Sequence, residues 1–234
     1  MKNHYTIEMH EVTKIYKMDN INVVGLENIN LKIKRGEFIC IMGPSGSGKS
    51  TMLHLMGCLD KPTSGKVFID GIDTSKMSED ELANLRRDKI GFVFQLFNLY
   101  PTLTALENVE LPMLIAKKDK EFRRKRAIEL LKMVEMEKLK DHLPSELSGG
   151  QRQKIAIARS LANNPRIILA DEPTGNLDSK SGEEVMKIFK DLNKKGKTIV
   201  IVTHNENVAK FAERIILLKD GKIIKDEKKI MEVR

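Results

Sequence analysis

The sequence predicts an α/β protein with a mostly parallel central sheet, joined to an antiparallel β subdomain near the amino terminus. Two observations support this fold class. Short apolar runs of strand length alternate with longer stretches of helical pattern through most of the chain, which favours parallel strands joined by right-handed crossovers. In ENINLKIKRGEF (27–38), apolar and polar residues alternate instead, and a period of two is typical of a half-buried antiparallel strand.

The predicted core strands share a short apolar run without alternation, which indicates burial on both faces. They are FICIMG (38–43), IGFVFQ (90–95), RIILADE (166–172) and TIVIVTH (198–204). The segments between them have helical length and apolar residues three and four positions apart. The predicted helices are 50–59, 126–136, 155–162 and 182–197, with a helical pattern from about 104 to 164. Asp70-Gly71 and Asp220-Gly221 indicate tight turns between paired strands.

Composition limits the possible classes of function. The chain has 234 residues, of which 41% are hydrophobic and 32% are charged, and this suits one soluble domain with a substantial core. The apolar runs are far shorter than the roughly 18 residues of a membrane span. The first residues lack the apolar core of a secretory signal. We therefore expect a cytoplasmic protein that reaches a membrane only through a partner.

The net charge of +8 is compatible with a nucleic-acid partner, an anionic membrane surface or a lysine-rich solvated face. The solvated face is favoured because the lysines are scattered along the chain. Aromatic residues make up only 5% of the sequence and Trp is absent, so a single-strand binder is disfavoured and no nucleic-acid partner is expected. Cys40 and Cys58 lie in or after apolar segments, and we predict buried thiols rather than zinc ligands.

The glycine-rich segment GPSGSGKS (43–50) follows an apolar strand and precedes a predicted helix. It fits the pattern of a phosphate-binding P-loop in full, so we expect a P-loop NTPase core. Its glycines let backbone amides converge on phosphates, and Lys49 would neutralise the β- and γ-phosphates of ATP while Ser50 binds Mg²⁺. A turn that merely ends a strand would not explain the Lys and Ser. The residues expected to contact the nucleotide are Gly43, Ser45, Gly46, Ser47, Gly48, Lys49, Ser50 and Thr51.

The strand RIILADE (166–172) ends in two carboxylates, Asp171 and Glu172. A carboxylate at the carboxyl end of a core strand can hold Mg²⁺, usually through water, and this suits Asp171. The water that attacks the γ-phosphate must be oriented and deprotonated, and Glu172 is the candidate base. The alternative, a pair of acids that caps the turn before Pro173, is weakened by the P-loop on the same chain.

A third motif, LSGGQ (147–151), completes a pattern that resembles the ATP-binding cassette of an ABC transporter over nearly the whole chain. In this resemblance, 43–50 is the Walker A loop and 166–172 is Walker B. Gln95 corresponds to the Q-loop glutamine, which implies a catalytic role and a place as Mg²⁺ ligand. Asp178 corresponds to the D-loop aspartate and His204 to the catalytic switch histidine. Tyr16 matches the aromatic residue that stacks on adenine. The D-loop has GNLD where many relatives have SALD. Because Leu177 and Asp178 are kept, the chemistry is expected to be intact.

The resemblance also implies a role for LSGGQ. In ABC cassettes this motif faces the ATP of a second subunit, so Ser148, Gly149, Gly150 and Gln151 are expected to bind a γ-phosphate across an interface. Two copies would close head-to-tail over two ATP molecules, and hydrolysis would let the pair open. The sequence alone does not distinguish this trans arrangement from one in which both loops of the same chain meet.

The same resemblance implies one ABC ATPase domain over 1–234. Residues 1–94 and 161–234 are expected to form the nucleotide-binding core with its antiparallel β subdomain. Residues 95–160 are expected to form a helical subdomain that carries the signature motif.

Finer stretches resemble the cassettes of lipoprotein-releasing and macrolide-exporter systems, namely 57–65, 86–91 and 90–112. This implies an integral membrane permease as partner, a location on the inner face of the cell membrane, and export or extraction of a lipoprotein, peptide or macrolide-like substrate. LFNLYPTL (96–103) is unusually apolar for a loop, and we expect it to accept a coupling helix of the permease. Local packing within the helical subdomain is the alternative.

Three other classes of protein share some of these motifs. A regulatory cassette of a cell-division-type membrane complex that controls wall remodelling would carry the same motifs. A soluble ABC ATPase of DNA repair or translation usually has a coiled-coil insertion, zinc cysteines or tandem cassettes, and the sequence has none of these. A P-loop kinase would leave LSGGQ and His204 unexplained.

Overall fold

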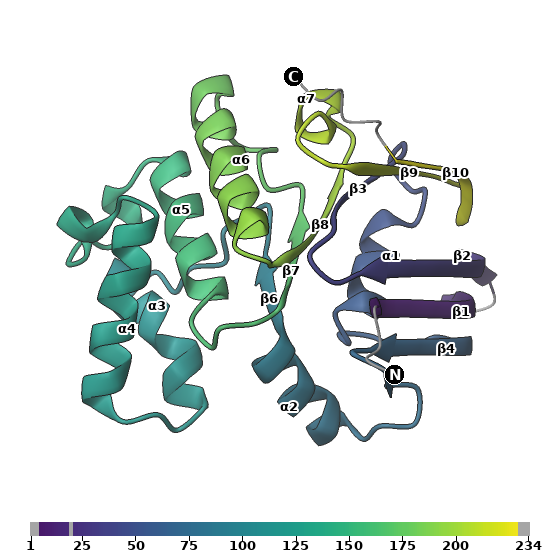
Figure 1. The fold of residues 1–234 in the computed structure, drawn as a ribbon, viewed down its shortest axis with the longest axis horizontal. Helices are drawn as coiled ribbons and strands as arrows, with labels where there is room; N and C mark the ends of the chain where they lie inside the picture. Colours follow the sequence, from purple (N-terminus) through teal and green to yellow (C-terminus); the bar gives the residue numbers. More distant parts are fainter. Residues whose placement is uncertain (1–4, 19–20, 229–234) are drawn as a thin grey trace.

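Two β-sheets organise the part of the chain that the structure, a computed structural model, describes, which is residues 5–18 and 21–228. A six-stranded sheet in the order β10-β9-β3-β8-β7-β6 forms the centre, and a four-stranded sheet in the order β2-β1-β4-β5 lies beside it (Figure 1). In these residues, no helix has the length and apolar character that a bilayer crossing needs.

The strands of the central sheet are β3 (Phe38–Met42), β6 (Ile90–Val93), β7 (Ile167–Asp171), β8 (Thr198–Thr203), β9 (Arg214–Lys219) and β10 (Lys222–Lys228). All are parallel except β10, which forms an antiparallel hairpin with β9. The apolar side chains of the three central strands, β3, β8 and β7, are almost entirely buried. Because β3, β8, β7 and β6 are neighbours, their carboxyl ends meet at one edge, where a ligand site is expected.

The second sheet contains β1 (Tyr5–Met18), β2 (Ile21–Lys34), β4 (Ser64–Ile69) and β5 (Ile72–Asp73), all antiparallel. Ile29, Leu31 and Ile33 are buried, and the polar residues between them are exposed, as the alternating pattern predicted. Asp70 and Gly71 both have positive φ angles, 48° and 81°, and form the predicted turn between β4 and β5. The α/β fold class with an antiparallel subdomain is confirmed.

The helices are α1 (Lys49–Met56), α2 (Glu79–Lys89), α3 (Ala105–Ile115), α4 (Lys120–Met133), α5 (Gly149–Ser160), α6 (Ser179–Lys194) and α7 (Glu206–Ala209), with 3-10 turns at Glu137–Leu139 and Pro144–Glu146. Helices α3, α4 and α5, hereafter the helical group, pack together at one end of the molecule (Figure 1). The central sheet separates two hydrophobic cores. One core joins the sheet to α6 and the helical group, and the other joins it to α1 and the antiparallel sheet.

Several elements differ from the sequence-based expectations. The helix predicted over 50–59 ends at Met56, because Cys58 adopts a left-handed conformation with φ 54°. The helical pattern of 104–164 is interrupted between Met133 and Gly149. Helix α2 was not predicted, although Ser78 and Glu81 form a capping box at its start and give it a readable signal. Both cysteines are buried, as predicted.

Candidate functional site

A pocket of about 620 Å³ opens at the carboxyl edge of the central sheet. Four neighbouring strands contribute to it through the residues that follow or end them. Its lining residues are Pro44, Ser45, Gly46, Gly48, Lys49, Ser50, Gln95, Asp171, Glu172 and His204. All of these except Pro44 were expected from the sequence, so the structure brings together the Walker A, Q-loop, Walker B and switch residues.

The loop between β3 and α1 requires glycine at two positions. A Cβ atom on Gly43 would lie 2.1 Å from the carbonyl oxygen of Leu218, and one on Gly48 would lie 2.3 Å from that of Gly25. Gly48 also has a φ of 99°, in the region that side chains disfavour. The backbone is therefore packed tightly from behind, which leaves its amides and the first turn of α1 available to the pocket.

Lys49 lies across this loop. Its Nζ donates hydrogen bonds to the carbonyl oxygens of Gly43 and Pro44, both at 2.8 Å. The ammonium group is thus held at the pocket, where a phosphate would be its strongest partner.

Asp171 and Ser50 offer oxygen atoms to a metal ion. Burial raises the pKa of Asp171, a hydrogen bond from the Ser50 hydroxyl opposes this, and the neighbouring Glu172 raises the pKa further. A cation would relieve the cost of this half-buried charge. Mg²⁺ takes few carboxylates and completes its shell with phosphate oxygens and water, so one carboxylate and one hydroxyl suit this ion.

The carboxylate of Glu172 is held by the end of the neighbouring strand β8. It accepts hydrogen bonds from Thr203 Oγ1 at 2.7 Å and from the backbone amide of His204 at 3.1 Å. His204 Nδ1 lies 2.7 Å from Glu172 Oε1, so this nitrogen carries the proton when the carboxylate is ionised. Glu172 adopts a left-handed φ of 43°, which turns it out of β7 towards these donors. Its own chain therefore orients the candidate base.

Gln95 does not end its strand, as the sequence suggested, but lies two residues beyond Val93 in a turn. Its carbonyl oxygen accepts a hydrogen bond from Asn176 at 3.1 Å. Its side-chain nitrogen, Nε2, lies close to Gly175. A Cβ atom added to that glycine would be 2.8 Å from Nε2. The Q-loop glutamine thus packs against the segment that follows Walker B.

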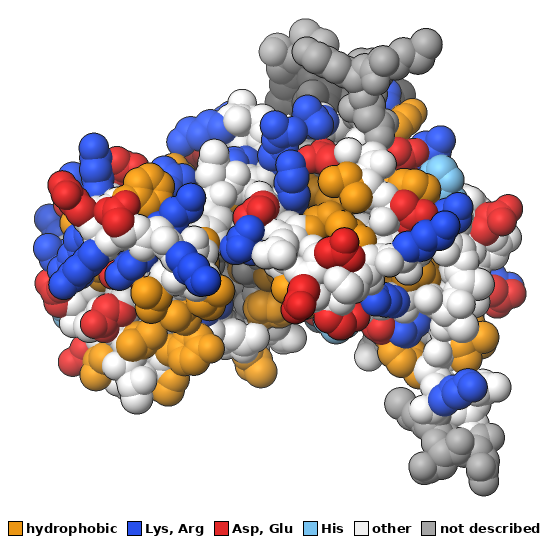
Figure 2. Space-filling model, turned by 90° about the horizontal axis from the view of Figure 1, so that it is seen from below, with side chains coloured by type: hydrophobic (Ala, Val, Ile, Leu, Met, Phe, Trp, Pro, Cys, Tyr) orange, Lys and Arg blue, Asp and Glu red, His pale blue; other side chains and the backbone are white. Residues whose placement is uncertain are grey.

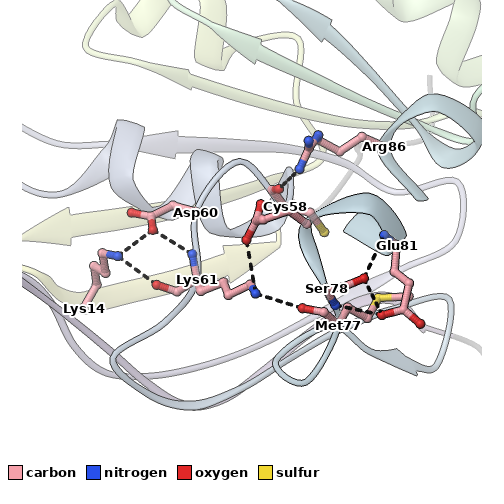
Figure 3. A network of polar contacts seen from close by, with 9 residues as sticks. Lys14, Cys58, Asp60, Lys61, Met77, Ser78, Glu81 and Arg86 are labelled. Atoms are coloured by element: carbon pink, nitrogen blue, oxygen red, sulfur yellow. Dashed lines mark hydrogen bonds and ion pairs between the residues drawn. The ribbon is translucent and has the colours of Figure 1, made fainter. Parts of the chain in front are cut away.

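Tyr16 lies on β1 beside the start of α1, away from the lining of the pocket. Its hydroxyl group lies 3.2 Å from Asp60 Oδ2 and 3.5 Å from Thr51 Oγ1, which was also expected at the nucleotide. Lys14 Nζ lies 2.6 Å from Asp60 Oδ1 and 5.0 Å from the centre of the Tyr16 ring. Figure 3 shows Lys14 and Asp60 in a chain of polar contacts that continues through Lys61 towards the start of α2. The tyrosine is oriented, and its stacking on adenine stays a prediction.

The signature motif caps its own helix. Ser148 Oγ accepts a hydrogen bond from the Gln151 amide at 3.3 Å, and Gln151 Oε1 accepts one from the Ser148 amide at 2.8 Å. Gly149 and Gly150 pack against Leu177 and Ser181 of the same chain. None of the residues 147–151 lines the pocket, and Figure 1 shows α5 and α1 on opposite sides of α6 and the central strands.

Asp178 caps the next helix, α6. Its carboxylate accepts hydrogen bonds from the Ser181 amide at 3.0 Å and from Ser181 Oγ at 2.7 Å. The backbone hydrogen bond from Ser181 holds the pKa of Asp178 below its ordinary value. Because Ser181 also contacts Gly150, the D-loop and the signature motif form one connected surface outside the pocket.

Comparison with known proteins identifies this arrangement. The family model described as ABC transporter matches residues 26–175, which include the P-loop, the signature motif and Walker B. The chain belongs to the ABC transporter family. It is an ABC-type ATPase cassette, the ATP-binding subunit of a transporter, and its fold class and its resemblance to ABC cassettes are confirmed.

The relatives of this cassette include proteins of similar and of greater length. An ABC transporter ATP-binding protein of Methanocaldococcus jannaschii, MJ0796, is 61% identical over 95% of this chain and 97% of its own. A solved structure described as a dimeric post-hydrolysis state of MJ0796 bound to ADP and Pi has a TM-score of 0.88 and 59% identity over 95% of this chain and 98% of that one. The macrolide export ATP-binding/permease protein MacB of Brucella abortus is 49% identical over 95% of this chain, which spans 34% of that protein.

Sequence reasoning missed three residues at or behind the site. Pro44 lines the pocket, and Thr203 holds Glu172. Gln153 lies fully buried beneath both strand ends. The signal for Gln153 was available, because it lies three and four residues before Ala156 and Ile157, on the buried face of α5.

Proposed function

We propose that the cassette binds and hydrolyses MgATP in a head-to-tail homodimer, in which each ATP lies between the P-loop of one copy and LSGGQ of the other. One observation carries this proposal. The pocket contains the P-loop, the two acids and the switch histidine but no residue of 147–151, and Ser148 is exposed at the start of α5. The solved structure of MJ0796, described as dimeric and bound to ADP and Pi, supports it.

Within each site, the residues of one chain bind and orient the reactants. Lys49 and the loop amides hold the phosphates, and Ser50, Asp171 and Gln95 hold Mg²⁺. The ion, when bound, neutralises negative charge on the phosphate oxygens. Glu172 takes the proton from the attacking water as general base.

His204 positions Glu172 before this step, because its Nδ1 lies 2.7 Å from the carboxylate. The side chain of His204 is 73% exposed, so it can turn towards a γ-phosphate without crossing packed core. Tyr16 stacks on adenine. Ser148, Gly149 and Gly150 of the second copy bind the γ-phosphate, because Ser148 Oγ accepts only one bond as a cap and retains its hydroxyl proton for a phosphate oxygen.

We also propose an integral membrane permease as the partner of the cassette, at the inner face of the membrane, and no nucleic-acid partner. A groove of about 390 Å³ is lined by residues of β6, α3 and α5. Its floor contains Phe92 and Phe94, and Ile115 and Arg159 line its walls. A short helix of the permease with apolar side chains would fit this groove.

The segment 96–103 has features that fit each of its two predicted roles. Leu99 packs against the hydrophobic core, whereas Leu96 and Tyr100 are 73% and 55% exposed. The exposed pair supports contact with the permease, and Leu99 supports local packing. Export or extraction of a lipoprotein, peptide or macrolide-like substrate is proposed from the similarity to MacB.

Gel filtration of Glu172→Gln tests this function. The variant should bind MgATP and elute as a stable dimer, because the γ-phosphate that holds the two copies together is no longer removed. Hydrolysis should fall by about a thousandfold or more. Glu183→Gln, the same change at an exposed position of α6, is the matched control and should behave as wild type. A monomeric elution profile with ATP, or near-normal turnover, would overturn the proposal.

A further inference from the structure

One buried side chain contacts the backbone next to both groups that act on the attacking water. Gln153 lies on α5 with no exposed surface. Its Nε2 donates to the carbonyl oxygen of Pro173 at 2.8 Å and lies 3.4 Å from that of Phe94. Pro173 follows Glu172 directly, and Phe94 precedes Gln95 directly. A single amide therefore fixes the distance between the ends of β7 and β6.

The other atom of this amide indicates that the contact has a purpose. Gln153 Oε1 is buried and has no hydrogen-bond partner. A buried acceptor without a partner destabilises the fold, and an apolar residue of the same shape would avoid this cost. The contacts that this amide makes are on its donor side, to the two carbonyl groups.

The helix that carries Gln153 also supports the rest of the Q-loop. Arg159, six residues further on, donates to the carbonyl oxygen of Phe97 at 2.9 Å and to that of Asn98. Phe97 and Asn98 have φ angles of 60° and 50°, a conformation that costs energy for residues other than glycine. Helix α5 thus holds the segment 94–98 in place, and a shift of this helix would move that segment.

We propose that Gln153 is a positioning residue that couples the two ATP sites of the dimer. The proposal rests on the head-to-tail arrangement proposed above. In that arrangement, Ser148 at the start of α5 touches the ATP held by the second copy, whereas Gln153 on the same helix holds the strand ends that carry Glu172 and Gln95. Occupation of one site therefore sets the geometry of the catalytic groups in the other.

The test replaces the amide with an unbranched apolar side chain in the full chain, Gln153→Met. ATP hydrolysis is measured against ATP concentration, and binding of a fluorescent ATP analogue is measured on the monomer. We expect kcat to fall about tenfold or more, because two backbone contacts are lost. The Hill coefficient should fall to about 1, since the sites become independent. The dissociation constant of the monomer should stay within about twofold of wild type, because Gln153 does not line the pocket.

Lys154→Met is the matched control. Lys154 is the next residue on α5, and its Nζ lies 2.9 Å from Glu184 rather than near either strand end. It should keep the kcat and Hill coefficient of wild type even if its melting temperature falls. An equal loss of kcat in Lys154→Met would overturn the proposal, because the effect would then follow stability. Unchanged kcat and cooperativity in Gln153→Met would overturn it as well.

If Gln153→Met does not fold, Gln153→Asn decides the question. Asparagine keeps the amide but is one methylene shorter, so it cannot reach both carbonyl groups. Loss of kcat with retained nucleotide binding supports the coupling role, and wild-type kcat excludes it. If the wild-type protein did not hydrolyse ATP, the proposed function would be wrong and the inference would fall with it. Failure of the inference alone would leave wild-type hydrolysis intact, so the two failures are distinguishable.

Discussion

The two glycine-rich loops of this cassette differ in what their own chain provides. The P-loop borders a pocket, and carbonyl groups of the same chain press against Gly43 and Gly48 from behind. LSGGQ borders no pocket that it shares with the P-loop, and its glycines pack against Leu177 and Ser181. Both loops offer helix amides to an anion. Only the P-loop has Asp171 and Glu172 beside it, which is why we propose that the second loop completes a site in another copy.

The helical group, which carries LSGGQ, also exposes hydrophobic side chains. Figure 2 shows hydrophobic side chains gathered on the side of the helical group, bordered by Lys and Arg side chains. The large apolar residues exposed at the end of α3 and the start of α4 are Leu114, Ile115 and Phe122. The helical group thus has an apolar surface suited to a partner, although large apolar residues such as Ile21 and Ile224 are also exposed on the two sheets.

Disrupting the second loop with a charged side chain should have a larger effect than adding a methyl group to either loop. Ser148→Arg should lower ATP hydrolysis by about a hundredfold or more, because a large cation replaces the hydroxyl at the dimer interface. ATP binding by the monomer should remain within about twofold of wild type, since Ser148 does not line the pocket. Filter binding and a phosphate-release assay measure the two quantities.

Ser145→Arg provides the control for this prediction. Ser145 is exposed and lies three residues upstream of Ser148, outside the helix cap. Its replacement by arginine makes the same change in size and charge. It should hydrolyse ATP normally. Loss of ATP binding in the Ser148→Arg monomer would contradict the separation of the two loops.

A smaller effect is expected from adding a methyl group to the first loop. Gly48→Ala would place Cβ 2.3 Å from the Gly25 carbonyl oxygen at a φ of 99°. The left-handed conformation alone costs about 1–2 kcal/mol, so ATP binding to the monomer should weaken about tenfold or more. Gly46→Ala has open space and should show only the conformational cost. Gly150→Ala, in the second loop, should leave monomer binding unchanged, and equal weakening by Gly150→Ala would contradict this account.

The smallest expected change is in stability, and it concerns the charge beside the P-loop. The folded-state pKa of Asp171 lies above the ordinary value of 3.8, mainly because of burial. The Asp171 carboxyl therefore holds its proton more tightly in the folded state than in the unfolded state. As a result, the nucleotide-free protein loses stability as pH rises from the ordinary pKa of 3.8 through the folded-state pKa. Asp171→Asn should raise the melting temperature in EDTA at pH 7 by on the order of 1–2 °C, and by nothing near pH 3, while hydrolysis is lost.

Asp88→Asn provides a control of opposite sign. A hydrogen bond from Arg87 holds the pKa of Asp88 below its ordinary value, so this carboxylate stabilises the folded state above that value. Its removal should not raise the melting temperature at pH 7. A thermal scan of both variants across pH 3–8 compares them, and a rise in Asp88→Asn would show that the shift in Asp171→Asn has another cause.

The geometry of the pocket was largely predictable because it depends on topology. Lys49, Asp171, Glu172 and His204 follow or end strands that the apolar pattern identifies, and parallel neighbours bring their carboxyl ends together. The hydrogen bond between Thr203 and Glu172 was not predictable, because it depends on a left-handed backbone that no local pattern requires.

The predictions that failed did so for two reasons. Some features depend on tertiary packing, and others had a local signal that was overlooked. The orientation of Gln153 follows from which face of α5 is buried, and its two partners lie 59 and 20 residues away in sequence. The capping box at Ser78 was a local signal that should have identified α2. Whether LSGGQ serves its own P-loop or another copy depends on assembly, which one chain does not encode in any local motif.

Mixing two inactive variants tests the trans arrangement most directly. Lys49→Ala disables the P-loop and Ser148→Arg disables the signature motif, so each variant alone should be nearly inactive. A mixed dimer contains one site with an intact P-loop and an intact LSGGQ from different chains. An equal mixture should therefore recover hydrolysis, up to about a quarter of wild-type activity if half of the dimers are mixed and half of their sites are intact. If the two loops of the same chain served one ATP, no site in the mixture would be complete, and the absence of any recovery would contradict this account.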